Sequence, residues 1–225
     1  MDLHAINILQ PFNGWMELRH FLAIFISCAC GLAIGYERTS RNKQAGVKTH
    51  MIVALTSCLM MIISKEAFLD SGLNADEIDH DRFGVFISSN IGGCEKIEES
   101  YEEDKINSHY IPAVLTNSAS SMVAIDFKAN GLNMSICSAC ASGNNTIGEA
   151  YLKIKYGMKD IMIAGASEFA INKKILKGFS VMRAIYTGED KEKASIPFDK
   201  YRQGFVIGEG TGILVLEELE HAIKR

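Results

Sequence analysis

Proline and tryptophan are scarce in this chain of 225 residues, and acidic side chains are scarce in its first 64 residues. The chain has three prolines and no Ser/Gly-rich run, so no linker separates its parts. The formal net charge of −4 provides no general attraction to nucleic acid. Six cysteines without a paired pattern argue against a disulfide framework and indicate a reducing compartment.

Two apolar runs dominate the N-terminal piece. Phe21–Tyr36 approaches the length of about 20 residues that a membrane-spanning helix needs, whereas Met51–Ile63 also suits a buried helix. Residues 37–48 between them carry four basic side chains, as cytoplasmic loops do. We therefore expect an all-α, membrane-like segment over residues 1–64, with membrane contact through residues 18–63.

This segment resembles the start of the MgtC/SapB family of bacterial inner-membrane proteins. The resemblance rests on Gly31-Leu32-Ala33-Ile34-Gly35-Tyr36-Glu37-Arg38, on Ala45-Gly46-Val47-Lys48-Thr49-His50 and on the apolar run ending at Ile63-Ser64. It implies an inner-membrane location for the segment. The further helices of that family are absent from this chain.

The most informative chemical feature is Cys140, which lies in a turn between an apolar strand and a helix. We predict the strand over Asn133–Ser138 and the helix from about Asn144 to Tyr156. The positive end of a helix dipole favours a thiolate, and small neighbouring residues let a substrate approach closely. This pattern is typical of a nucleophile for acyl transfer.

The remainder of the C-terminal piece alternates strands with helices, which predicts an α/β layered fold. We expect strands over residues 83–88, 161–164 and 210–217, and helices ending at Gly72 and running from Glu217 to Arg225. The glycine-rich stretch 204–210 is not followed by a Lys-Ser/Thr pair, so it indicates a turn and not a phosphate loop.

Residues 65–225 resemble the first half of the beta-ketoacyl-acyl-carrier-protein synthase II family of condensing enzymes. The matching pieces, in the family's order, are Ser71-Gly72-Leu73, Ser89 to Gly93, Ser138 to Gly143, Ile161 to Glu168, Gly178-Phe179 with Arg183-Ala184, Pro197 to Lys200, and Gly204-Phe205 through Glu217-Glu218. The resemblance implies an incomplete thiolase-like α/β/α half-domain over residues 65–225 that belongs to an acyltransferase of fatty acid elongation.

The same resemblance implies roles for three residues. Cys140 would accept the acyl chain from an acyl carrier protein, and its backbone N–H would form one arm of an oxyanion hole. Ile91 and Phe179 would line the acyl pocket, although from the residues alone both suit a protein core. It further implies a homodimer, malonyl or acyl thioesters of the carrier as substrates, no cofactor and no metal.

One departure from the family concerns histidine. The family's condensation step uses two histidines from its second half, and none of the six histidines here falls in a matching motif. An enolate that develops during loss of carbon dioxide would then have no imidazole to stabilise it. We therefore expect negligible condensing activity from this chain alone.

Three other interpretations stay open. The first is a membrane protein of MgtC type with an unrelated tail. The second is a chimaera of two fragments: if both apolar runs spanned, Lys65 would emerge outside, away from the cytoplasm where the condensing half would meet its carrier protein. The third is thiol redox chemistry at Cys137-x-x-Cys140, which the expected place of Cys137 in a strand disfavours.

Overall fold

A computed structural model describes residues 14–40, 47–93, 97, 100, 106 and 110–225. The chain divides into two compact units, Met1–Ile62 and Ile63–Arg225, each with its own internal contacts. Each unit is described by itself below.

The first unit contains α1 (Gly14–Ser40) and most of α2 (Val47–Asp70). Within α1, Leu18–Glu37 is long and apolar enough to cross a bilayer, although a signal sequence near an N-terminus has the same properties. Gly31 and Gly35 are buried, whereas Phe21 and Phe25 are exposed. One side of α1 therefore allows close packing and the other presents apolar surface.

The predicted basic loop is shorter than expected. Glu37–Ser40 belongs to α1 and Val47 begins α2, while Arg41–Gly46 lies outside the described residues. The helix predicted to end at Gly72 is the end of α2, and Gly72 has a φ of 70°, the left-handed conformation common after a helix. The expected boundary near Lys65 therefore falls inside one continuous helix.

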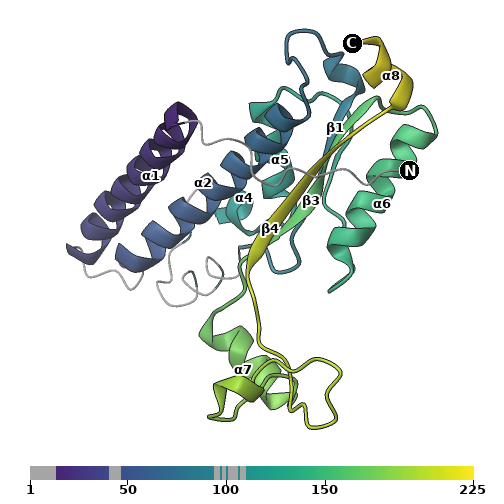
Figure 1. The fold of residues 1–225 in the computed structure, drawn as a ribbon. Coiled ribbons are helices and arrows are strands. Elements are labelled where there is room, and N and C mark those ends of the chain that lie inside the picture. The colour runs from purple at the N-terminus through teal and green to yellow at the C-terminus, as the bar shows by residue number, and fades with distance from the viewer. Residues whose placement is uncertain (1–13, 41–46, 94–96, 98–99, 101–105, 107–109) are drawn as a thin grey trace. The chain divides into compact units, whose positions relative to one another are not determined.

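The second unit is built on a four-stranded sheet of order β2-β1-β3-β4. Its strands are β1 (Phe83–Ser88), β2 (Asn133–Met134), β3 (Ile161–Glu168) and β4 (Gly210–Glu217). Figure 1 shows β1, β3 and β4 side by side. β1 pairs in parallel with both β2 and β3, and β4 runs antiparallel to β3. Every residue of β1 is buried, as expected for a parallel strand covered on both faces.

The unit also contains, among its described residues, the elements η1 (His80–Arg82), α4 (Tyr110–Val114), α5 (Ser118–Asp126), α6 (Ser142–Lys155), α7 (Lys173–Val181), η2 (Lys191–Lys193) and α8 (Leu219–Lys224).

Helices cover both faces of the sheet, which confirms the α/β class. On one face Phe86 and Met162 pack with Ala150 of α6. On the other, Phe83 packs with Phe127, which follows α5, with ring centroids 6.4 Å apart. Because side chains alternate along a strand, neighbouring residues of β1 belong to different cores.

Several predicted bounds were wrong. The strand expected over Asn133–Ser138 pairs only at its first two residues, because the chain leaves β1 before it reaches the Cys140 turn. β3 continues to Glu168, beyond the predicted end at Ala164, because β4 pairs with its whole length. The helix expected from Asn144 begins at Ser142. The strands at 83–88 and 210–217 are confirmed.

Candidate functional site

Cys140 lies in a tight turn that leads directly into α6. The N–H of Ala141 donates to the carbonyl of Ser138 at 3.3 Å, and the N–H of Ser142 donates to the carbonyl of Ala139 at 3.0 Å. Ala139 has a φ of 53°, a left-handed conformation that costs a residue other than glycine about 1 kcal/mol. Cys140 is exposed, so this strained turn presents its thiol to solvent two residues before the helix begins.

The hydroxyl of Ser142 holds the two ends of this turn together. It accepts a hydrogen bond from the N–H of Ser138 at 2.8 Å, and it lies 2.7 Å from the carbonyl oxygen of Ala139. The amide of Asn145 donates to the hydroxyl of Ser138 at 2.6 Å. Since Ser142 is buried, its two bonds are partly shielded from competing water, whereas the bond between Asn145 and Ser138 is exposed.

Asn90 connects the turn to the sheet. It follows β1, and its Oδ1 lies 2.5 Å from the Ser142 hydroxyl and 3.5 Å from Sγ of Cys137, both of which are donors. Its own N–H donates to Oε2 of Glu168, the last residue of β3, at 2.8 Å. The carboxyl ends of β1 and β3 thus meet the start of α6 at one residue, Asn90, whose side chain bonds to Ser142 and whose backbone N–H bonds to the side chain of Glu168.

Sequence reasoning missed Asn90, Ser142 and Glu168 as parts of the site. A signal was available, since Asn90 and Glu168 lie at or just beyond the carboxyl ends of two predicted strands. In open α/β sheets, functional groups gather at that edge.

The structure places the two predicted pocket residues differently. Ile91 is partly buried and follows Asn90, so it lies at the same end of the sheet as the Cys140 turn. Phe179 lies in α7 and packs edge-on against Phe205, with ring centroids 5.4 Å apart. Among the described contacts, none joins Phe179 to the turn. The assignment of both side chains to an acyl pocket stays a prediction.

The two described histidines of this unit, His80 and His221, lie at the end of the sheet away from the Cys140 turn. His80 precedes β1, and His221 lies in α8, where its Nδ1 is 2.6 Å from Oε1 of Glu217. Cys140 instead follows the carboxyl end of the parallel strands. His109 lies outside the described residues. Within the described part of residues 63–225, no hydrogen bond links a histidine to Cys140.

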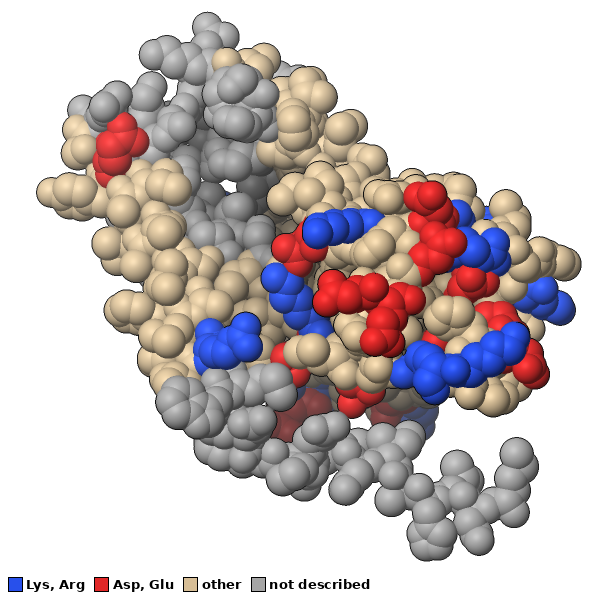
Figure 2. All heavy atoms as spheres, turned by 90° about the horizontal axis from the view of Figure 1, so that it is seen from above, with Lys and Arg blue, Asp and Glu red and all other residues tan. Residues whose placement is uncertain are grey.

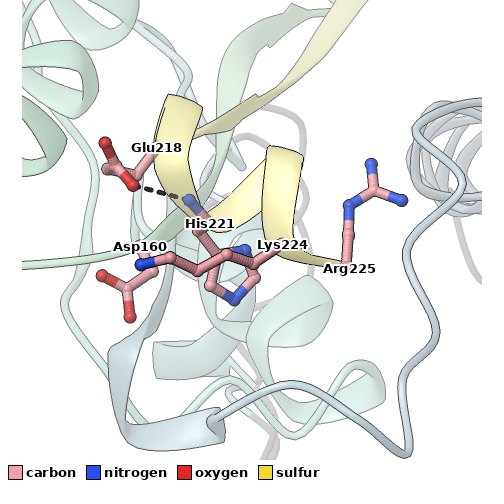
Figure 3. Close-up of a pocket in the computed structure, with 5 residues that line it drawn as sticks. All are labelled: Asp160, Glu218, His221, Lys224 and Arg225. Atoms are coloured by element: carbon pink, nitrogen blue, oxygen red, sulfur yellow. Dashed lines mark hydrogen bonds between the residues drawn. The ribbon is translucent and has the colours of Figure 1, made fainter.

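An open hollow at the histidine end is lined by charged and titratable side chains. Its lining residues are Asp160, Glu218, His221, Lys224 and Arg225 (Figure 3). The hydrogen bond from Arg82 holds the pKa of Asp160 below its usual value. Backbone N–H groups of Glu220 and His221 lower the pKa of Glu218, which caps α8. Asp160 bonds to Arg82, Glu218 accepts from the backbone N–H of His221, and His221 and Arg225 both contact Glu217, so these bonds tie together the end of the sheet away from Cys140.

Charges of both signs are interspersed on the surface shown in Figure 2, without one extended patch of a single sign among the coloured residues. Among the described residues there is also no group of three or more His, Cys, Asp or Glu side chains placed to hold a metal ion. The chemistry available at the turn is therefore that of an exposed thiol beside a helix start.

Most of this chain is similar to known proteins. Residues 50–222 match the family model described as beta-ketoacyl synthase, N-terminal domain. The 3-oxoacyl-(acyl-carrier-protein) synthase 2 of Coxiella burnetii is 44% identical over 169 residues, which are 72% of this chain and 41% of that protein. The synthase 2 of Staphylococcus aureus is 40% identical over 171 residues, 73% of this chain and 42% of that protein.

Solved structures agree with these relatives. One match is a chain of the AntDE:AntF structure, a type II PKS acyl-carrier protein in complex with its ketosynthase bound to the hexaketide. Its TM-score is 0.70 and its identity 32%, over 75% of this chain and 45% of that one. A beta-ketoacyl synthase from Burkholderia phymatum matches with a TM-score of 0.66 and 30% identity, over 75% and 43%. The chain spans about two fifths of the length of its curated relatives. From residue 50 to residue 222, this chain belongs to the beta-ketoacyl synthase family as its N-terminal domain.

Proposed function

We propose that this chain carries the acyl-accepting half of a 3-oxoacyl-acyl-carrier-protein synthase and that Cys140 is its nucleophile. The observation that carries the proposal is the exposed Cys140 in a strained turn, two residues before α6, within the family's N-terminal domain. The natural partner is an acyl carrier protein, because two curated relatives are named for it and one structural neighbour is a ketosynthase bound to such a carrier.

The proposed step is a transfer between two thiols. Sγ of Cys140 attacks the carbonyl carbon of the carrier's thioester, and a new carbon–sulfur bond forms as the old one breaks. The proton lost by Cys140 ends, through solvent, on the departing carrier thiol.

We further propose that this chain, acting alone, accepts the acyl group but does not complete the condensation. The second step removes carbon dioxide from a malonyl thioester, and hydrogen-bond donors must stabilise the enolate that forms. His80 and His221, the described histidines of this unit, lie at the end of the sheet away from Cys140. Acylation without condensation is therefore the expected activity.

The experiment is acylation of the purified chain by an octanoyl thioester of an acyl carrier protein. We expect a mass increase equal to one octanoyl group on the peptide that contains Cys140, and its loss in Cys140→Ala. Cys137→Ala is the matched control, because Cys137 is also exposed and lies three residues away. Acylation that persists in Cys140→Ala, or that is absent from the unchanged chain, would refute the proposal.

A homodimer and membrane contact are secondary proposals. β2 pairs with β1 on one side only in the described sheet, and Met134 at its end is exposed, so its other edge suits a second copy of the chain.

The apolar exposed side of α1 suits a lipid surface, which is what the MgtC/SapB resemblance predicts. The condensing half would then work at the cytoplasmic side of an inner membrane.

A further inference from the structure

We propose that Asn90 is a positioning residue for Cys140, which it holds in place through the hydroxyl of Ser142. The inference rests on the proposed acyl transfer and extends it to a residue that does not touch the substrate. Its basis is the 2.5 Å hydrogen bond between Ser142 Oγ and Asn90 Oδ1, which joins the loop after β1 to the first residue of α6.

Ser142 is suited to transmit the position of Asn90 to the nucleophile. Ser138 and Ser142 lie two residues before and two residues after Cys140, and they are bonded to each other through the Ser138 N–H at 2.8 Å. The Ser142 hydroxyl has one proton, which it can give to Asn90 or to the carbonyl of Ala139. When the proton goes to Asn90, the turn is tied to the sheet. When it goes to Ala139, the turn is closed on itself alone.

Asn90 is itself fixed by the neighbouring strand. Its N–H donates to Glu168 Oε2 at 2.8 Å, and the hydroxyl of Ser89 donates to Glu168 Oε1 at 3.4 Å. Glu168 ends β3 and pairs with Gly210 of β4. Asn90 and Glu168 therefore connect the turn that carries Cys140 to the ends of β1 and β3.

Loss of the Asn90 side chain should affect acylation more than it affects folding. The Ser142 proton can still reach Ala139, so the turn stays closed and the stability changes little. The turn, however, loses its hydrogen bond to the loop after β1, which also carries Ile91, and is held to the sheet through the packing of α6. A displacement of about 1 Å from the reactive geometry lowers rates by as much as about a hundredfold.

The test compares Asn90→Ala with Asn90→Asp, in which a side-chain oxygen can still accept from Ser142. Asn74→Ala is the matched control, because Asn74 is an exposed asparagine whose side chain bonds only to its own loop, at Glu77 and Asp76. For each protein we would measure the rate of Cys140 acylation by octanoyl-carrier thioester, the thermal unfolding midpoint, and deuterium uptake by the peptide over residues 137–146.

We expect Asn90→Ala to lower the acylation rate about ten- to a hundredfold, to raise deuterium uptake in that peptide, and to leave the midpoint within a few degrees. Asn90→Asp should restore most of the rate, and Asn74→Ala should match the unchanged chain. The proposal is overturned if Asn90→Ala acylates normally, if its deuterium uptake is unchanged, or if Asn90→Asp is as slow as Asn90→Ala.

A second variant and a second measurement cover the cases in which Asn90→Ala does not fold or the unchanged chain is not acylated. If Asn90→Ala does not fold, Ser142→Ala removes the same bond from the helix side, and normal acylation by that variant would contradict the inference. If the unchanged chain is not acylated at all, the proposed function fails, whereas deuterium uptake still reports whether Asn90 holds the turn. The two failures are thereby distinguished.

Discussion

Arg82 and Asp160 join the beginnings of β1 and β3 at the end of the sheet away from Cys140. The guanidinium donates from Nη2 to Oδ1 of Asp160 at 2.6 Å and also from Nε to Oδ2, and Arg82 reaches the carbonyl of Gly157 at 3.0 Å. These bonds lower the pKa of Asp160, so the folded state binds its proton more weakly than the unfolded state does.

Acid should therefore weaken the contribution of the Arg82–Asp160 pair to the free energy of unfolding. Stability from Asp160 is present above the ordinary carboxylate pKa of about 3.9 and is lost as the pH falls from there through the lower folded value. We expect Asp160→Asn to lower the urea midpoint at pH 7, and the difference from the unchanged chain to shrink below about pH 4. Asp76→Asn, at an exposed aspartate, should show no such difference; a gap that stays constant with pH would contradict the assignment.

Enlarging Ile91 tests the predicted acyl pocket. If Ile91 lines the pocket, Ile91→Phe fills space that a long acyl chain needs, and acylation by a long-chain thioester should fall about tenfold or more while acetyl transfer is retained. The measurement is the rate of mass increase at the Cys140 peptide with carriers of different chain length. Ile223→Phe, at an exposed residue of α8, is the control. Equal effects on short and long chains would place Ile91 in the core instead.

Thr146 offers a prediction about stability. Its hydroxyl is buried in α6 and has no hydrogen-bond partner among the described residues. Thr146→Val replaces it with a methyl group of similar size, so we expect the free energy of unfolding to rise by about 1 kcal/mol. In contrast, Thr211→Val should lower it, because the Thr211 hydroxyl bonds to that of Ser167 at 2.8 Å. A loss of stability in Thr146→Val would indicate a bound water at that hydroxyl.

Measuring the release of carbon dioxide tests the proposal that this chain does not carry out the condensation step. With no imidazole bonded to Cys140 in the described structure, we expect no decarboxylation of malonyl-carrier thioester above the background, since each missing donor costs about 10²–10³ in rate. The measurement is labelled carbon dioxide released by the purified chain, with Cys140→Ala as the blank. Release that requires Cys140 would show that this chain stabilises the enolate by other groups.

The apolar side of α1 predicts binding to lipid. Phe25 and Ile26 are exposed within the candidate span, so the full chain should float with phospholipid vesicles. Ile26→Asp should weaken flotation, because an aspartate near the centre of a bilayer costs about 3 kcal/mol. Leu69→Asp, at an exposed leucine outside the span, should leave flotation unchanged. If the protein stays in the aqueous fraction and does not float with the vesicles, the membrane proposal is wrong.

Local patterns in the sequence determined much of the architecture. The apolar run Phe83–Ser88 and the apolar stretch after the glycine-rich turn at 204–210 predicted two strands with the observed bounds, because a short run between turn residues has few other structures available. The small residues around Cys140 likewise predicted a turn before a helix. The motif order predicted the family, which the match over residues 50–222 confirms.

Tertiary structure decided what no local pattern contains. The brevity of β2 and the extension of β3 to Glu168 depend on pairing between strands far apart in the chain. The bond between Asn90 and Ser142 joins residues 52 positions apart, and the separation of His80 and His221 from Cys140 follows from the direction of the strands. The chain by itself specified which groups are present, whereas the sheet decided which of them meet, because contacts between distant residues depend on strand order and register.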